Sequence, residues 1–86
     1  MYTLVLTKQA ERSFNRLMKS QPDIGRRVAH ALDILSEDPS QGIPLRGDLK
    51  GLYKYRVGTY RIIYKVVHSK LIVTVIDIGH RKDIYR

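Results

Sequence analysis

The chain has 86 residues, 43% of them hydrophobic and 28% charged, which fits one small folded domain covering residues 1–86 and excludes a disordered or collagen-like chain. Because cysteine is missing and no apolar run approaches the roughly 20 residues of a membrane helix, disulfides, thiolate metal sites and a membrane span are excluded as well. Sixteen Lys and Arg residues against eight Asp and Glu residues give a net charge of +8, which points to a polyanionic partner.

The N-terminal half predicts one strand followed by two helices. Residues 2–7 are β-branched and apolar, with Tyr2, Leu4 and Leu6 in alternation, which indicates a strand, and Thr7 can cap the helix that follows. Residues 8–20 repeat apolar side chains at helical spacing. A second helix is expected to begin at the capping and proline signals of residues 20–23 and to end at residues 37–39.

The C-terminal half predicts three more strands. A stretch rich in Pro and Gly, residues 40–51, should form a loop. Strands are expected over residues 52–57, 60–67 and 71–78, followed by a basic tail over residues 79–86. The class is therefore α+β with the order β-α-α-β-β-β. Because no helix separates the last three strands, we expect a small antiparallel meander with both helices packed on one face and the other face bare.

The hairpin between the second and third predicted strands brings cations together. A two-residue turn at residues 58–59 sets the register and pairs Arg56 directly with Arg61. Lys54 and Lys65 fall on the same face. Like charges directly opposite each other are unfavourable unless an anion lies between them, so the pattern predicts a phosphate site. The alternative is a solvated sheet face whose cations deter aggregation.

Charge is distributed unevenly along the chain. Residues 1–43 hold six basic and five acidic side chains, whereas residues 44–86 hold ten basic and three acidic ones. The last strand should return so that its end lies near Arg61, which would bring His80, Arg81 and Lys82 to the same end of the sheet. We therefore expect the binding surface in the second half of the chain.

Other motifs give no support for a cofactor. Gly42 and Gly47 have the glycine spacing of a P-loop, but Asp48 stands where its lysine belongs, so a nucleoside triphosphate site is rejected. The three histidines lack the spacing of metal ligands. Residues 1–4 carry no basic leader or cleavable apolar segment, so export is not expected and a cytoplasmic location is predicted.

Four segments together resemble the RelE/ParE superfamily of toxins from type II toxin-antitoxin pairs. They are Leu45-Arg46-Gly47, Tyr53-Lys54-Tyr55-Arg56-Val57, Tyr60-Arg61-Ile62-Ile63-Tyr64 and the run from Gly79 to Tyr85. The resemblance covers almost the whole chain and implies the α+β fold of that superfamily. In its RelE branch it implies a metal-independent, ribosome-dependent endoribonuclease that cuts messenger RNA, with the ribosome, messenger RNA and a cognate antitoxin as partners.

The resemblance also implies the catalytic residues. They are Lys54, Arg56, Arg61, Arg81 and Tyr85. Arg61 would stabilise the phosphate, Arg81 would stabilise or protonate the leaving group, and either Lys54 or Tyr85 would act as the base. Arg56 stands where the best-known RelE pattern has a lysine, and a permanently charged arginine cannot be a base.

Six further residues are expected to contact RNA. They are Arg46, Lys50, Lys65, His80, Lys82 and Arg86. His80 is also a candidate proton shuttle because histidine titrates near neutrality. Two alternatives stay open: a ParE-like toxin that inhibits DNA gyrase without catalysis, and a catalytically silent RNA-binding module.

Overall fold

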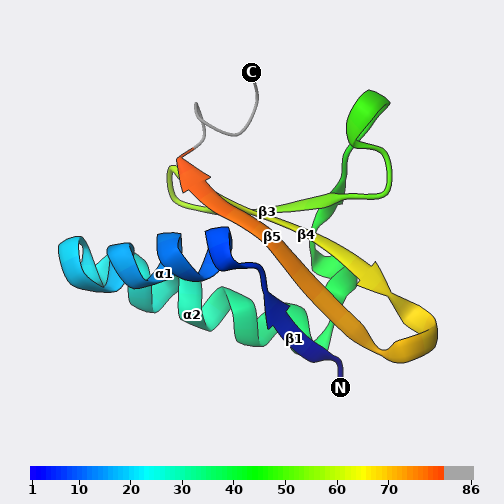
Figure 1. Ribbon diagram of the computed structural model, residues 1–86, viewed down its shortest axis with the longest axis horizontal. Helices are drawn as coiled ribbons and strands as arrows, with labels where there is room; N and C mark the ends of the chain where they lie inside the picture. The colour runs from blue at the N-terminus through cyan, green and yellow to red at the C-terminus, as the bar shows by residue number, and fades with distance from the viewer. Residues whose placement is uncertain (81–86) are drawn as a thin grey trace.

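Five strands form one mixed sheet in the spatial order β1-β5-β4-β3-β2, and two helices cover one of its faces (Figure 1). The structure is a computed structural model that describes residues 1–80. Its strands are β1 (Thr3–Leu6), β2 (Ile43–Pro44), β3 (Tyr53–Val57), β4 (Tyr60–Val67) and β5 (Ile72–His80). Its helices are α1 (Lys8–Ser20) and α2 (Pro22–Glu37).

The two helices begin and end where capping residues allow it. The Thr7 hydroxyl accepts a hydrogen bond from the backbone N–H of Ala10 at 3.1 Å, which confirms its predicted capping role. The same hydroxyl donates to the carbonyl oxygen of Ile76 at 2.8 Å and so fixes the start of α1 to β5. Pro22 occupies the first turn of α2, where its missing N–H costs no helical hydrogen bond.

The predicted meander is confirmed, because β3, β4 and β5 pair in sequence and antiparallel. The strand at the N-terminus joins the same sheet by pairing parallel to β5. The first departure from prediction is β2, which lies inside the segment expected to be a loop and pairs Ile43 with Lys54 and Pro44 with Tyr53. A two-residue edge strand has no readable alternation, and Pro is tolerated at a sheet edge. β5 also continues to His80, two residues beyond its expected end.

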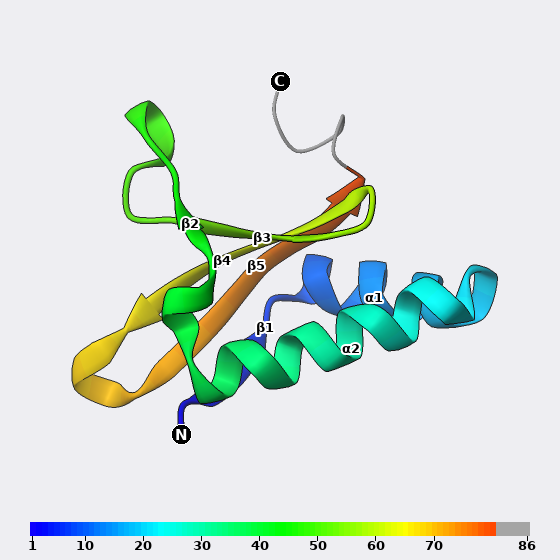
Figure 2. The same cartoon turned by 180° about the vertical axis from the view of Figure 1, so that it is seen from behind.

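The core lies between the sheet and the two helices, which Figure 2 shows from behind. Its largest fully buried side chain is that of Tyr64 on β4. The Tyr64 hydroxyl donates a hydrogen bond to the carbonyl oxygen of Pro39 at 2.6 Å, and its ring stacks on that of Tyr53 with centroids 5.5 Å apart. Tyr64 therefore links the sheet to the segment between α2 and β2.

The environment of Tyr64 predicts a loss of stability in alkali. Burial raises the pKa of the Tyr64 phenol from 10.0 to about 12. The stabilising effect of the neutral phenol is thus complete below the pKa of the unfolded chain and is lost as the pH rises from 10.0 toward 12. From about pH 9 to about pH 11, the native protein should lose about 1.4 kcal/mol more unfolding free energy than Tyr64→Phe, measured by urea denaturation. Equal losses in both proteins would contradict this assignment.

Candidate functional site

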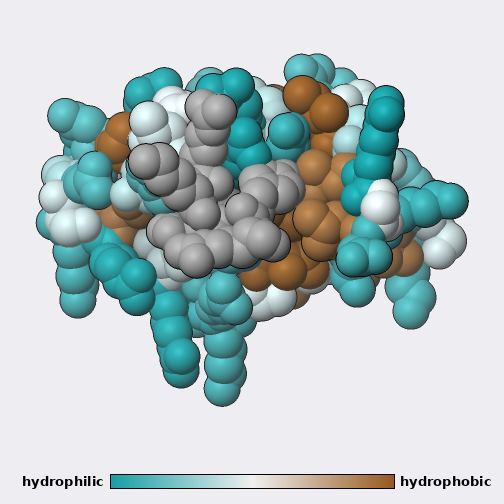
Figure 3. All heavy atoms as spheres, turned by 90° about the horizontal axis from the view of Figure 1, so that it is seen from above, coloured by the Kyte–Doolittle hydropathy of each residue, from teal (hydrophilic) through white to brown (hydrophobic). Residues whose placement is uncertain are grey.

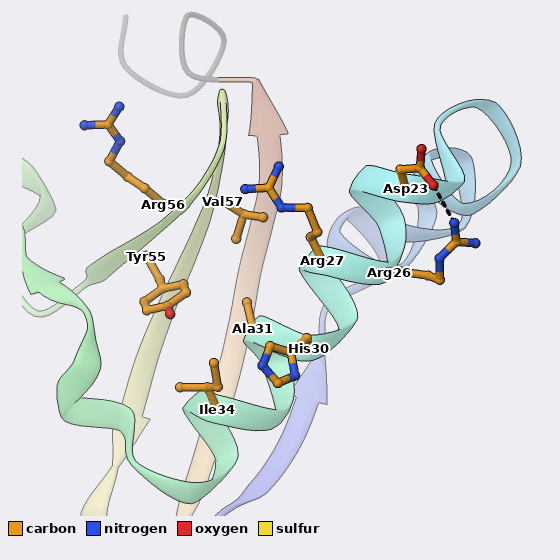
Figure 4. Close-up of a pocket in the computed structure, with 9 residues that line it drawn as sticks. All are labelled: Asp23, Arg26, Arg27, His30, Ala31, Ile34, Tyr55, Arg56 and Val57. Carbon is orange, nitrogen blue, oxygen red and sulfur yellow. Dashed lines mark hydrogen bonds and ion pairs between the residues drawn. The ribbon is translucent and has the colours of Figure 1, made fainter.

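The β3–β4 hairpin places two arginines directly opposite each other. Arg56 pairs with Arg61, as the two-residue turn predicts, and Gly58 in that turn adopts a positive φ of 60°. Val57 and Ile62, which alternate with the arginines, are buried in the core beneath the sheet. The arginines therefore belong to the face that points away from the helices, and Figure 4 shows Arg56 turned away from α2.

The two arginines differ in their surroundings. Arg56 is exposed, whereas Arg61 is buried and only 9% of its surface is accessible to solvent. On the other side of β4, Arg61 pairs with Gly79, which carries no side chain. Gly79 thus adds no side chain beside Arg61, and the planar fork of donors of a guanidinium group suits a phosphate.

Neither helix covers this face, as predicted, yet not every side chain on it is exposed. Ile63, on the same face as Arg61, is only 4% exposed. Figure 3, which looks onto this side of the molecule, shows apolar side chains among the hydrophilic ones. Alternation along a strand predicts which face a residue lies on, but it does not predict what the rest of the chain does above that face. The burial of Arg61 extends to the Nε atom of its guanidinium group.

Two lysines extend the arginine pair along the strands. Lys54 is half-buried, lies two residues before Arg56 and pairs with Ile63. Lys65 is exposed and pairs with Thr74, four residues beyond Arg61 and thus roughly 13 Å along β4. The hairpin therefore brings Lys54, Arg56 and Arg61 together, with Lys65 farther along the same strand.

The remaining expected RNA contacts are scattered or outside the described residues. Arg46 and Lys50 are exposed and flank a short 3-10 helix, Gly47–Leu49, that precedes β3. This segment stands up from the sheet on the side away from the helices (Figures 1 and 2). Four of the expected site residues lie outside the described residues 1–80: Arg81, Lys82, Tyr85 and Arg86.

His80 lies on the other face of the sheet from Arg61. It pairs with Tyr60, and the two rings meet edge-to-face with centroids 5.6 Å apart. The Tyr60 hydroxyl accepts a hydrogen bond from the Gln21 side chain at 3.0 Å, which places this pair beside the helices. A proton shuttle at His80 toward the Arg56–Arg61 pair is therefore not supported. The signal was available in the sequence, because Ile78 is a core residue two positions earlier.

A groove between α2 and β3 was not predicted (Figure 4). Its volume is about 540 Å³, and its walls combine apolar side chains with cations. The apolar part includes Ala31, Ile34 and Val57, while Arg27 and His30 supply positive or titratable groups. A Cβ atom added at Gly58 would lie 3.5 Å from Arg27, so this arginine reaches the hairpin turn. The Arg26 guanidinium at the end of the groove is ion-paired with Asp23.

The described residues offer cationic chemistry at this site. Within residues 1–80, no group of three or more His, Asp or Glu side chains is arranged to hold a metal ion. Over the same residues, no helix combines the length and hydropathy that crossing a membrane requires. Guanidinium groups on opposed strands can stabilise the negative charge that develops on a phosphate during transfer.

The chain resembles known toxins over its whole length. The family described as "ParE toxin of type II toxin-antitoxin system, parDE" matches residues 4–85. Toxin RelG of Mycobacterium tuberculosis is 37% identical, covering 99% of this chain and 97% of that protein. Toxin RelE of the same organism is 33% identical, covering 99% of this chain and 87% of that protein.

Solved structures share the fold. The toxin-antitoxin complex RelBE2 of Mycobacterium tuberculosis contains a chain that is 33% identical, with a TM-score of 0.82 and coverage of 93% of this chain and 98% of the other. The E. coli RelBE complex contains one that is 25% identical, with a TM-score of 0.76 and coverage of 93% and 96%. The predicted α+β architecture and the resemblance read from the sequence are both confirmed.

Proposed function

The chain belongs to the ParE toxin family of type II toxin-antitoxin systems, within the RelE/ParE superfamily, and from this premise we propose that it is a ribosome-dependent endoribonuclease that cuts messenger RNA. The observation that carries this proposal is the directly opposed pair of Arg56 and Arg61, with Lys54 on the same strand as Arg56. Like charges held across a ladder are relieved by a phosphate between them. Inhibition of translation follows from loss of the message.

The proposed reaction is an internal phosphoryl transfer in RNA. A base takes the proton of a ribose 2′-hydroxyl, whose oxygen forms a new bond to the adjacent phosphorus. The bond from phosphorus to the 5′-oxygen of the next nucleotide breaks, and an acid protonates that oxygen. The products are a 2′,3′-cyclic phosphate and a 5′-hydroxyl end. Negative charge grows on the phosphate oxygens in the transition state, where fixed guanidinium groups bind it most strongly.

Each residue of the arginine pair and its neighbours has a role in this proposal. Arg61, held with little freedom beside Gly79, stabilises the phosphorane oxygens. Arg56 adds charge, and Lys54 is a candidate base for the 2′-hydroxyl. The proposed acid Arg81 and the alternative base Tyr85 lie outside the described residues. Because arginine carries its charge at all relevant pH values, the site needs no metal ion to neutralise the phosphate.

Purified protein and ribosomes programmed with a short messenger RNA provide the direct test of this function. The proposed reaction predicts fragments whose downstream piece begins with a 5′-hydroxyl and can be labelled by polynucleotide kinase without prior dephosphorylation. A metal chelator should leave the rate of messenger RNA cleavage unchanged as long as the ribosomes stay intact, which sedimentation checks. Fragments that begin with a 5′-phosphate, or an intact message, would contradict the proposal.

A cognate antitoxin is the proposed protein partner. The RelBE2 and E. coli RelBE structures, which share this fold, are toxin-antitoxin complexes. The groove between α2 and β3 combines an apolar wall at Ala31, Ile34 and Val57 with the cation of Arg27. Such a wall with a positive rim is complementary to an amphipathic segment that carries acidic residues.

Charge reversal at the groove should weaken antitoxin binding. We expect Arg27→Glu to raise the dissociation constant about tenfold to hundredfold, because a rim cation would be replaced by a carboxylate facing acidic groups. The measurement is isothermal titration with the antitoxin encoded by the neighbouring reading frame. Lys70→Glu changes the charge equally at an exposed position away from the groove and should have little effect. Equal effects of both variants would contradict docking in this groove.

A second candidate function is inhibition of DNA gyrase, which the match to the ParE family favours. In that case the fold acts through protein contacts and performs no chemistry on RNA. Cleavage complexes between gyrase and DNA would then accumulate in the presence of the protein, and messenger RNA on ribosomes would stay intact. The two functions are thus separated by two standard assays on the same preparation.

A further inference from the structure

Helix α1 carries a row of cations on the side opposite its buried residues. Its core side includes Ala10 and Leu17, which are buried against the rest of the protein. The row on the other side is exposed and consists of Lys8, Arg12, Arg16 and Lys19. These positions are four, four and three residues apart, so the side chains are neighbours along one helical face. We call this set the α1 cation row.

The α1 cation row opposes helix stability unless a counter-charge is bound. Like charges four residues apart destabilise a helix by about 0.2–0.5 kcal/mol per pair. Within residues 1–80, no member of the row forms an ion pair, and the recorded ion pair of Arg26 with Asp23 lies on α2. Glu11 is the sole acidic residue of α1. The row therefore presents nearly uncompensated positive charge to an external partner.

Two adjoining hollows connect the row to the end of β5. The first has a volume of about 590 Å³ and is lined by Lys8, Arg12 and Arg16 together with the neutral donors Gln9 and Ser13. The second, of about 330 Å³, shares Gln9, Ser13 and Arg16 and extends to Gly79. Gly79 is the partner of Arg61 in the sheet. Tyr60 and His80 also line the second hollow, so the surface continues from the outer side of α1 to the end of β5 on the helix side of the sheet, the face opposite Arg61. Figure 1 shows β5 ending beside α1.

The chemistry of this surface suits a nucleic-acid backbone better than a protein. Protein interfaces are built around an apolar centre. The first hollow has no large apolar residue, and the second has Leu17 and Tyr60 among mainly polar residues that include the carboxylate of Asp77. Interfaces with nucleic acid are more polar and far more positive. Cations four residues apart on a helix are about 6 Å apart along its axis, similar to the separation of successive phosphates along an RNA strand. Gln and Ser side chains between them can bond to phosphate or ribose oxygens.

We propose that the α1 cation row and its two hollows bind a segment of single-stranded RNA, outside the site where the RNA is cut. The choice of RNA among polyanions rests on the proposed function. Contacts of this kind position the strand and carry no sequence information, and they depend strongly on salt. Tethering at α1 would raise the local concentration of RNA beside Arg61.

The test measures RNA binding without cleavage. Arg61→Ala provides the background, and the probe is a short fluorescein-labelled single-stranded RNA followed by anisotropy over a salt series. Adding Arg12→Gln and Arg16→Gln should reduce the magnitude of the salt slope by about 1.4 and weaken binding at 0.1 M salt on the order of tenfold to thirtyfold. The matched control, Arg26→Gln with Lys70→Gln, removes the same charge at exposed positions away from the row. Glutamine is a good helix former, so α1 should persist, as circular dichroism would verify.

Each outcome has a defined meaning. A loss confined to the Arg12 and Arg16 variant supports the inference even if no RNA is ever cleaved, in which case the proposed nuclease function fails while this surface stands. Equal RNA binding by the Arg61→Ala background, the test variant and the control overturns the inference. A test variant that binds RNA normally but loses affinity for the antitoxin would show that the row contacts an acidic protein, and this too overturns it.

Discussion

Replacement of Arg61 by alanine is expected to lower the rate of messenger RNA cleavage on ribosomes by about 10²–10³-fold, the typical loss when one fixed donor to a developing oxyanion is removed. The reason is the combination of charge and restraint at this position. Arg61 is largely buried, lies directly opposite Arg56 and borders Gly79 on its other side. Single-turnover cleavage with saturating ribosomes measures the chemical step, so a loss there cannot be attributed to weaker binding.

Two further variants isolate the role of the Arg61 guanidinium. Arg61→Lys keeps the charge but loses the planar fork of donors, and we expect a rate between those of the native protein and Arg61→Ala. Lys70→Ala removes a cation from an exposed turn and should retain the native rate. Because Arg61 is buried, urea denaturation must show that each variant is folded in the assay. A folded Arg61→Ala protein with the native rate would remove Arg61 from the mechanism.

Replacement of Gly42 by alanine is expected to destabilise the protein by about 3 kcal/mol, at the upper end of the usual cost of overpacking a core. An added Cβ would lie 2.0 Å from the hydroxyl oxygen of Tyr64, 2.8 Å from its ring carbon and 2.9 Å from the carbonyl oxygen of Lys54. The φ of Gly42 is −83°, so alanine brings no backbone strain and the cost is steric. Urea denaturation gives the free energy of unfolding directly.

A double-mutant cycle locates the cause of the Gly42 effect. Tyr64→Phe removes the oxygen that the new methyl group would strike, so Gly42→Ala should cost clearly less in the Tyr64→Phe background than in the native protein. The contact with the Lys54 carbonyl would remain in both backgrounds. Equal costs in the two backgrounds would mean that the alanine is accommodated by moving the main chain rather than by displacing Tyr64.

The sequence predicted the elements whose signals are local. Thr7 and Pro22 mark the helix starts, and a two-residue turn after Val57 leaves one register for the hairpin, so the opposition of Arg56 and Arg61 could be stated in advance. The order and spacing of the tyrosine and arginine motifs were specific enough to indicate the family, which the relatives confirm.

Features that depend on distant parts of the chain were not predictable in the same way. The burial of Arg61 and Ile63 could not be read from strand alternation, which predicts the face of a residue and not its exposure. The close approach of Gly42 to Tyr64 joins positions separated by 22 residues and has no local signature. The groove beside Arg27 lies where α2 meets β3, and it is an outcome of packing rather than a sequence pattern. His80 lies at the same end of the sheet as Arg61, as predicted, but alternation along β5 puts it on the opposite face.

Primer extension on a translated message after brief expression of the protein shows directly whether the opposed arginines form a site for cutting RNA on the ribosome. We expect breaks in phase with the reading frame in cells that express the native chain, and none in cells that express a folded Arg61→Ala variant at equal abundance. An intact message in the presence of the native chain, with accumulation of gyrase–DNA cleavage complexes in the same cells, would contradict it.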